Sequence, residues 1–141
     1  MVELSWNKKW NKYDDVYKKE RNNEIFAIEE KDLKELLEIQ QKNFNNKQNY
    51  ENIQNMYKLL QENKDIYVLG YYIKDCLVGT LTLNVITLTL GKEATIWDLA
   101  IKEEYRRLGI ATKLMNKAEE IAKSYIGYDE NRDKAFVKQI K

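Results

Sequence analysis

The amino-acid sequence predicts an α+β fold in which helices pack against a central sheet that is mixed but mostly antiparallel. Two β-rich runs, Ile66 to Ile73 and Leu77 to Leu88, are separated by a short turn and therefore predict a hairpin. Two helical patterns precede this hairpin, and a third follows a strand predicted at Ala94 to Ile101. The predicted order is β-α-α-β-β-β-α and a tail, with an extra N-terminal helix, and the helices must cover the sheet.

The length and the charge balance are those of one globular domain. The chain has 141 residues, of which 43% are apolar and 33% are charged. The formal net charge is +1, so no bulk field favours nucleic acid or a membrane surface. The sequence shows no apolar run as long as a membrane span and no signal-peptide pattern. We therefore expect a cytoplasmic protein with no nucleic-acid partner and no membrane partner.

The chain contains one cysteine and no histidine. Ser-His-Asp and Cys-His catalysis both need an imidazole, so these mechanisms are excluded. Zinc sites built from cysteine and histidine are excluded as well, and we expect no metal. One cysteine cannot form an internal disulfide, which fits a reducing compartment. This residue, Cys76, lies in the predicted hairpin turn and is expected to be a non-catalytic thiol.

Residues 1–22 are predicted to form an amphipathic helix with an aromatic face. The large aromatic side chains follow helical spacing, at Trp6, Trp10, Tyr13 and Tyr17. This face either packs on the protein's own core or offers a surface to a substrate or a second subunit, which leaves a homodimer open. Residues 23–141 are then expected to form a single domain.

A short strand and two helices are predicted to follow. Glu24 to Glu29 is the expected strand, and Asp32 with Glu35 resembles a capping box at the start of a helix. The apolar stripe of this helix comprises Leu33, Leu36, Leu37 and Phe44. Residues 45–49 are polar and predict a loop. The next helix has an apolar stripe that we expect to contact the core, formed by Ile53, Met56, Tyr57 and Leu60.

The later elements show clear periodicity. In the second hairpin strand, Leu81, Leu83 and Val85 alternate with threonine or asparagine, which is typical of a half-buried strand. Gly91-Lys92 predicts the turn into the following strand. The last helix has a predicted buried stripe of Ile110, Leu114, Met115, Ala118, Ile121, Ala122 and Tyr125. The tail, residues 126–141, is expected to be a polar loop and a short regular end.

The junction between the strand at 94–101 and the last helix has the features of an anion site. It reads Arg106-Arg107-Leu108-Gly109-Ile110-Ala111. The first N–H groups of a helix have no intrahelical partner, and the helix dipole places partial positive charge there. Arginines beside such a turn add bidentate donors for phosphate oxygens.

The alternative is one continuous surface helix over residues 102–125. An ion pair between Glu103 and Arg107 would stabilise it by only about 0.3–0.5 kcal/mol. A glycine inside that helix, Gly109, would cost about 1 kcal/mol relative to alanine. The continuous helix gives no reason for Gly109, so the sequence favours the anion site.

Arg106-x-x-Gly109-x-Ala111 at a strand-to-helix junction resembles the signature of the GNAT acyl-CoA N-acyltransferase superfamily. That signature has Arg or Gln, then Gly three residues later, then Gly or Ala two residues after that. The segment IWDLAIKEEYRR is similar to the family's fourth strand and turn, and KDCLVGTLTL to its second-to-third strand hairpin. The element order matches over roughly residues 24–125. The resemblance implies a GNAT-like fold for residues 23–141 and acetyl-CoA as co-substrate.

The resemblance also implies how acetyl-CoA would be bound. Its pyrophosphate would lie on the backbone N–H groups from Arg107 to Thr112, with the arginine side chains at the rim. Gly109, which lacks a Cβ, and the small Ala111 would allow close approach. The pantetheine arm would pair with the backbone of the fourth strand. The cofactor-binding residues implied in this way are Leu99, Ile101, Arg106, Arg107, Gly109, Ile110, Ala111 and Thr112.

Asp98 is the expected catalytic residue. It is an acid in an otherwise apolar strand, beside Trp97 and Leu99, where desolvation would make it a better proton acceptor. It matches a position where some GNAT enzymes place a functional carboxylate, although Trp97 stands where some relatives carry a second acid. Asp98 could instead accept hydrogen bonds from nearby backbone or a lysine, or bind the cationic amine without taking its proton. A backbone N–H near Leu99 would stabilise the oxyanion.

The acid that protonates the departing thiolate is not assigned. Many family members use a tyrosine on a later helix, but in the similar fragment, residues 131–138, Val137 occupies that place. Tyr125 and Tyr128 are the alternatives. The chain is short at its C-terminal end compared with the family. Either the sheet is shortened, or a partner chain or the N-terminal helix covers its edge.

The resemblance therefore predicts an N-acetyltransferase that moves an acetyl group from acetyl-CoA to a primary amine by direct attack in a ternary complex. The acceptor would be a small-molecule or peptide amine. The alternative is a non-catalytic acyl-CoA-binding or protein-interaction domain with an incomplete acceptor site.

Overall fold

The computed structural model describes residues 20–45 and 47–128. The aromatic residues of the predicted N-terminal helix lie outside these residues, as does the fragment 131–138 with Val137. Within the described chain, the strands are β1 (Glu24–Ala27), β2 (Ile66–Ile73), β3 (Cys76–Leu88) and β4 (Gly91–Ile101). The helices are α3 (Leu33–Phe44), α4 (Tyr50–Gln61) and α5 (Ile110–Lys123), with short 3-10 turns at Glu30–Asp32 and Glu103–Tyr105. None of the described helices is long and apolar enough to cross a membrane.

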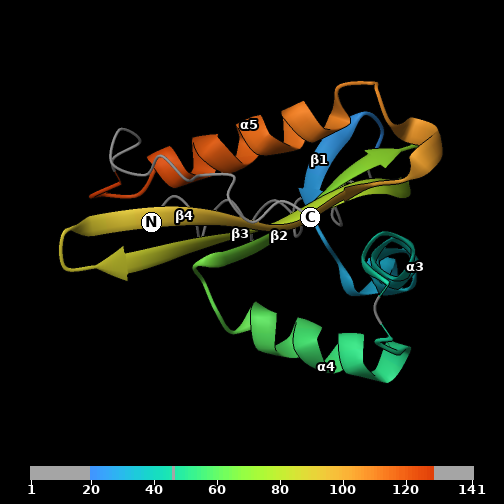
Figure 1. The fold of residues 1–141 in the computed structure, drawn as a ribbon, viewed down its shortest axis with the longest axis horizontal. Coiled ribbons are helices and arrows are strands. Elements are labelled where there is room, and N and C mark those ends of the chain that lie inside the picture. The colour runs from blue at the N-terminus through green and yellow to red at the C-terminus, as the bar shows by residue number, and fades with distance from the viewer. Residues whose placement is uncertain (1–19, 46, 129–141) are drawn as a thin grey trace.

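The sheet has four antiparallel strands in the order β1-β2-β3-β4. Helix α5 covers one face, whereas α3 and α4 lie on the other (Figure 1). Within the described residues, β4 is an edge strand whose outer side pairs only through a parallel bridge between Lys92 and Tyr128. The predicted α+β fold and the predicted order β-α-α-β-β-β-α are confirmed, whereas the predicted N-terminal helix and most of the tail lie outside the described residues.

Each face of the sheet carries its own core. On the α5 face, the alternating residues of β3 pack with the stripe of α5, including the fully buried Leu114 and Ala118. On the other face, α3 packs through its apolar residues on Phe26, Tyr72 and Leu77. The predicted stripe of Leu81, Leu83 and Val85 is thus the α5 side of the sheet.

The start of α3 differs from the expected capping box. The reciprocal pair is formed by Glu29 and Asp32 around the 3-10 turn, three residues before the predicted pair. Asp32 is the N-cap residue of α3 but does not cap it with its side chain. The reason is that its carboxylate is already occupied by Arg21, by the Tyr72 hydroxyl and by the Glu29 N–H. The Glu35 carboxylate instead accepts a hydrogen bond from the Leu77 N–H at 3.3 Å.

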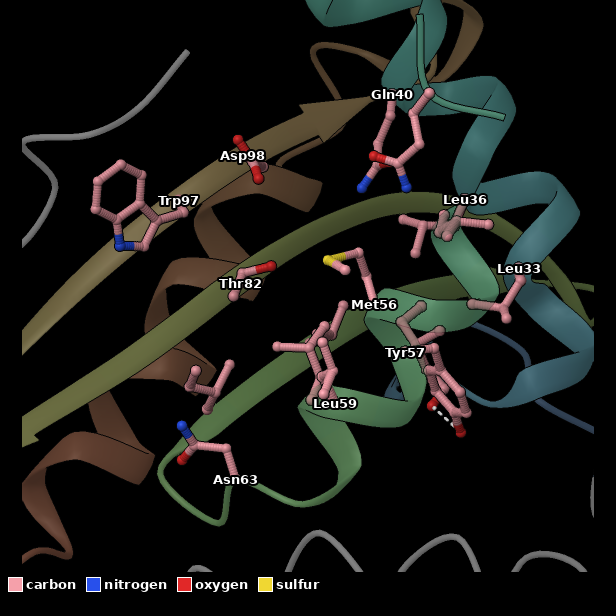
Figure 2. A pocket seen from close by; sticks show the side chains of 16 residues that line it. Leu33, Leu36, Gln40, Met56, Tyr57, Leu59, Asn63, Thr82, Trp97 and Asp98 are labelled. Atoms are coloured by element: carbon pink, nitrogen blue, oxygen red, sulfur yellow. Dashed lines mark hydrogen bonds between the residues drawn. The ribbon is translucent and has the colours of Figure 1, made fainter. Parts of the chain in front are cut away.

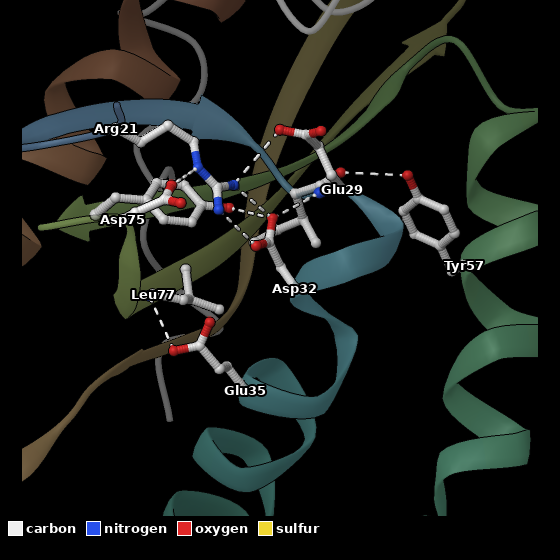
Figure 3. Close-up of polar contacts among 9 residues, drawn as sticks. Arg21, Glu29, Asp32, Glu35, Tyr57, Asp75 and Leu77 are labelled. Carbon is white, nitrogen blue, oxygen red and sulfur yellow. Dashed lines mark hydrogen bonds and ion pairs between the residues drawn. The ribbon is translucent and has the colours of Figure 1, made fainter. Parts of the chain in front are cut away.

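Arg21 is the centre of a buried polar cluster that joins the start of the described chain to the sheet (Figure 3). Its guanidinium donates to both oxygens of Asp32 at 2.8 and 2.9 Å and to Asp75 at 2.6 Å. It also lies 3.9 Å from the centre of the Tyr72 ring. Burial alone would lower the pKa of Arg21, but the hydrogen bonds to Asp32 and Asp75 outweigh burial and raise it. The cluster therefore holds β1, the 3-10 turn and the β2–β3 turn together.

Helix α4 is less buried than its apolar stripe predicts. Ile53 is buried, but Met56 is 47% exposed and its neighbour Leu59 is 59% exposed. The expectation that the whole stripe contacts the core is wrong. The reason is that α4 packs on α3 and leaves a hollow between itself and the sheet, as described below.

Candidate functional site

The loop before α5 is shaped by two residues in the left-handed region of backbone space. Arg107 has φ 66° and Gly109 has φ 81°. The chain therefore turns sharply after the 3-10 turn, and α5 begins only at Ile110. The Lys113 N–H donates to the Gly109 carbonyl at 3.1 Å, the first bond of the new helix. One continuous helix over residues 102–125 is thus excluded.

The N–H groups from Arg107 to Thr112 make no hydrogen bond to any other described residue. They border a hollow of about 290 Å³, which we call the Gly109 hollow. Every residue of the motif from Arg106 to Ala111 except Leu108 lines this hollow. The complete lining is Ile101, Tyr105, Arg106, Arg107, Gly109, Ile110, Ala111 and Thr112. A Cβ placed on Gly109 would meet nothing within 4 Å, so glycine is needed here for its backbone conformation and leaves the approach open. Unpaired amides at a helix start beside a hollow fit a diphosphate.

The two arginines have different surroundings. Arg106 Nε donates to the Ile101 carbonyl at 3.0 Å, and its Nη2 donates to Asn43 Oδ1 at 2.8 Å. Arg106 therefore ties the end of β4 to α3. The Arg107 side chain is exposed and makes no hydrogen bond or ion pair within the described residues. Of the two, Arg107 is the one whose guanidinium is available to an anion.

A bulge in β4 determines where Asp98 lies. The pairing with β3 passes from Thr82↔Trp97 to Thr80↔Ala100, so two residues of β4 face one residue of β3. Asp98 takes the left-handed conformation, with φ 55°. Because of this extra residue, Asp98 lines a hollow together with Trp97, whereas Leu99 packs against the α5 core.

Downstream of the bulge, the backbone of β4 lies at an open edge. The Lys102 N–H donates to Val78 of β3, whereas the Ile101 carbonyl accepts from Arg106 on the other side. The backbone groups of Ile101 thus point away from β3, toward the Gly109 hollow that Ile101 lines. This edge leaves room for an extended chain to pair with it, as an added strand does.

A second hollow, of about 470 Å³, lies between α3, α4 and the sheet, and we call it the α3–α4 hollow (Figure 2). Gln40 and Leu36 reach it from α3, Met56 and Leu59 from α4, and Asp98 from β4 (Figure 2). The complete lining is Ile28, Leu33, Leu36, Gln40, Gln48, Ile53, Met56, Tyr57, Leu59, Leu60, Asn63, Ile66, Val68, Thr82, Trp97 and Asp98. Asp98 is the only charged residue of this lining.

Tyr57, on the lining of the α3–α4 hollow, is a neutral donor. Its hydroxyl donates to the Ile28 carbonyl at 3.4 Å. Burial, followed by the nearby carboxylates of Glu29, Glu30 and Asp32, raises the pKa of Tyr57 to about 12. The phenol therefore stays protonated across the physiological range.

The structure does not support Tyr125 as the acid for the thiolate. Tyr125 follows the C-terminal end of α5 and belongs to the core on the α5 side of the sheet, not to the hollow that Asp98 lines. It is buried, and its hydroxyl bonds Tyr67 at 2.8 Å and Asp65 at 3.1 Å. Tyr128 lies beyond it and pairs with Lys92, also away from the start of α5.

The sequence reasoning did not single out Gln40 or Arg21. The sequence does contain a feature that marks Gln40. It lies four residues from both Leu36 and Phe44, so it is a polar residue within the apolar stripe of α3. Arg21 had none, because a single arginine before a strand does not differ from a solvated charge. Among the described residues, no group of three His, Cys, Asp or Glu side chains could hold a metal ion.

Comparisons with protein families and with solved structures point to the same family. A family model described as the acetyltransferase (GNAT) family matches residues 31–131. A transcriptional regulator from Bacillus halodurans is 18% identical with a TM-score of 0.71, over 84% of this chain and 80% of that one.

Two further solved structures are similar in fold. An aminoglycoside 6'-N-acetyltransferase from Acinetobacter haemolyticus is 24% identical, with a TM-score of 0.61 over 72% of each chain. A glucosamine-6-phosphate N-acetyltransferase from Arabidopsis thaliana is 13% identical, with a TM-score of 0.64 over 84% of this chain and 79% of that one. The comparison with curated proteins found no match.

Proposed function

The chain belongs to the GNAT family of acetyltransferases, and from this premise we propose that it transfers an acetyl group from acetyl-CoA to a primary amine. The amine attacks directly while both substrates are bound. A carbon–nitrogen bond forms at the acetyl carbonyl, the carbon–sulfur bond breaks, the amine loses a proton and CoA leaves as its thiol.

The observation that carries the proposal is the set of unpaired N–H groups at the start of α5 beside the Gly109 hollow. Pyrophosphate oxygens would accept from these amides, and the helix dipole favours the negative charge. Arg107 would add a charge-assisted contact, whereas Arg106 would act by holding β4 and α3 in place. Acetyl-CoA, when bound, supplies an acyl group activated as a thioester.

Asp98 is the proposed general base. It lies on the lining of the α3–α4 hollow, where the acceptor would enter, and next to the open edge of β4. An alkyl amine titrates near pH 10, so an adjacent carboxylate that first holds the ammonium and then receives its proton would promote attack. A backbone N–H at the bulge, near Leu99, is the proposed donor to the carbonyl oxygen. A thiol with a pKa near 8.5 can leave without a dedicated acid.

The first experiment measures acetyl-CoA binding by calorimetry. We expect wild-type protein to bind acetyl-CoA, and Arg107→Ala to weaken binding by about three- to tenfold because one charge-assisted contact is lost. Lys123→Ala is the matched control, since it removes one positive charge at the far end of the same helix. Absence of binding in the wild type would reject the proposal.

The second experiment separates catalysis from binding alone. Thiol release with a panel of amines should show turnover, and Asp98→Asn should lower kcat by at least about 100-fold with little change in acetyl-CoA affinity. Acetyl-CoA binding without turnover on any amine would instead indicate a non-catalytic acyl-CoA-binding domain. Equal turnover of wild type and Asp98→Asn at every pH would remove the base role.

A further inference from the structure

We propose that the α3–α4 hollow selects one class of acceptor, a singly charged amine on an apolar body that carries one neutral N–H or O–H donor. In this proposal Gln40 is the residue that binds the neutral donor. The inference rests on the proposed function, because it treats this hollow as the acceptor site, and it goes further by naming the chemistry that the hollow accepts.

The charge of the acceptor follows from the lining of the hollow. Asp98 contributes its only formal charge, and no lysine or arginine lines it. One carboxylate can balance one ammonium group, but a second cationic group would lose hydration without a partner. An anionic group, such as a phosphate, would be repelled by Asp98 and would meet no basic side chain.

The apolar side chains that line the hollow indicate that the acceptor has an apolar body. Met56, Leu59 and Trp97 are large apolar side chains that are 47%, 59% and 39% exposed, and all three line the hollow. A solvent-exposed apolar surface of this kind is covered when an apolar ligand binds, which gives a favourable hydrophobic contribution. A volume of about 470 Å³ lies in the range of small-molecule sites.

The side chain of Gln40 indicates that the acceptor carries a neutral hydrogen-bond donor. Its Oε1 atom is the one buried side-chain oxygen or nitrogen that lacks a hydrogen-bond partner among the described residues. A buried acceptor without a donor is unfavourable, and such atoms in folded proteins normally have a partner. The Tyr57 hydroxyl, the one phenol of the lining, donates to the Ile28 carbonyl instead. The Oε1 atom is itself buried, so a ligand hydroxyl or N–H would satisfy it once the Gln40 side chain, which lines the hollow, turns toward the ligand.

The same side chains face one another across the hollow. Gln40 comes from α3, Asp98 and Trp97 come from β4, and Met56 reaches toward them from α4, below them in the view (Figure 2). An acceptor placed between these elements would direct its ammonium group to Asp98 and its neutral donor to Gln40. Its apolar body would rest on Met56.

The test compares hydroxylated and plain arylalkylamines by calorimetric binding, with and without CoA. The probes are tyramine, its meta isomer and phenethylamine, which has the same body without the hydroxyl group. We expect at least one hydroxylated amine to bind wild-type protein about three- to tenfold more tightly than phenethylamine. In Gln40→Met, which keeps the side-chain volume and removes the amide, this ratio should fall to about one.

Two controls complete the test. Gln61→Met replaces a glutamine at the end of α4 that does not line the hollow, and it should keep the wild-type ratio. Spermidine and glucosamine 6-phosphate represent a polycation and an anionic amine, and both should bind more weakly than tyramine. The melting temperature of Gln40→Met should equal or exceed that of wild type, because a buried unpaired oxygen is removed.

Several results would overturn the proposal: no amine binds, the hydroxyl group gives no gain, the gain persists in Gln40→Met, or spermidine or the sugar phosphate binds best. Loss of affinity for all amines equally, together with a lower melting temperature, would show a purely structural role for Gln40. These outcomes depend on amine binding alone. They remain distinguishable from a failure of acetyl-CoA binding or turnover, which would reject the proposed function.

Discussion

Asp98 lies on the α3–α4 hollow because of one extra residue in β4. Regular alternation would place Asp98 on the same face as Ile96, which is buried under α5. The bulge and the left-handed conformation of Asp98 turn its side chain to the face of Trp97 instead. Aspartate tolerates this conformation better than most residues, which allows the bulge to form here.

Two residues of the loop before α5, Arg107 and Gly109, have a left-handed backbone, and we expect substitutions at these two positions to change the stability of the fold differently. Gly109→Ala should destabilise the fold by about 1 kcal/mol, because φ 81° is strained for alanine although its Cβ has free space. Arg107→Gly should stabilise it or leave it unchanged, since glycine relieves the strain at φ 66°. Urea unfolding measures the free energy of unfolding of both variants. A Gly109→Ala variant as stable as wild type would show that the left-handed backbone does not require glycine at this position.

Tyr57 predicts a pH dependence of stability. Its pKa is about 12 in the folded protein, against about 10 for an ordinary tyrosine. Below pH 10 both states hold the proton, but between pH 10 and 12 the unfolded state loses it first, so stability falls as the pH rises. Tyr57→Phe should lose less stability than wild type between pH 9 and pH 11, as measured by unfolding at each pH. An identical loss in both proteins would show that Tyr57 does not titrate in this way.

At the scale of elements, the polar cluster of Arg21 joins three parts of the chain that the sequence separates. Asp32 comes from the 3-10 turn before α3, Asp75 from the turn between β2 and β3, and Tyr72 from β2 itself. Burial and the neighbouring Asp32 carboxylate raise the pKa of Tyr72, so its hydroxyl remains a donor. Removing a buried member of such a network is costly, because its partners are left unpaired at low dielectric.

Removal of Arg21 should therefore have a large effect. Arg21→Ala leaves Asp32 buried without its cation, which should cost about 3–5 kcal/mol in the free energy of unfolding. Asp75→Asn should cost less than about 1 kcal/mol, since Asp75 is half exposed. Chemical denaturation of the two variants compares these values. If the two variants lost similar free energies of unfolding, burial of the ion pair would not determine its contribution to stability.

At the scale of the whole molecule, the two faces of the sheet have different roles. The α5 face is filled by a continuous apolar core. The other face is packed by α3 but is hollow beneath α4, so apolar side chains there remain exposed. We infer that the first face contributes mostly stability and the second is available for an acceptor.

This division predicts a separation of stability from binding. Leu114→Ala, at a fully buried site under α5, should cost about 2–5 kcal/mol in the free energy of unfolding. Met56→Ala, at the wall of the α3–α4 hollow, should cost less than about 1 kcal/mol but weaken arylalkylamine binding. Unfolding and calorimetric binding of the two variants test this. A Met56→Ala variant that binds amines like wild type would contradict the role of this wall.

The sequence by itself determined the order of the elements and the place of the motif, because both depend on local patterns. Periodicity located the stripe of β3 and the stripe of α5, and Gly109 marked the break before α5, since only the immediate chain sets these features. That the motif binds acetyl-CoA stays a prediction.

Only the tertiary structure decided which side chains meet. The bulge that turns Asp98 into a hollow depends on the pairing of β3 with β4, and the isolated acceptor of Gln40 depends on how α3 and α4 lie over the sheet. Arg21 likewise acquires its partners only when a turn and a strand distant in sequence pack around it. Such contacts join residues that no local period relates, so the folded chain alone brings them together.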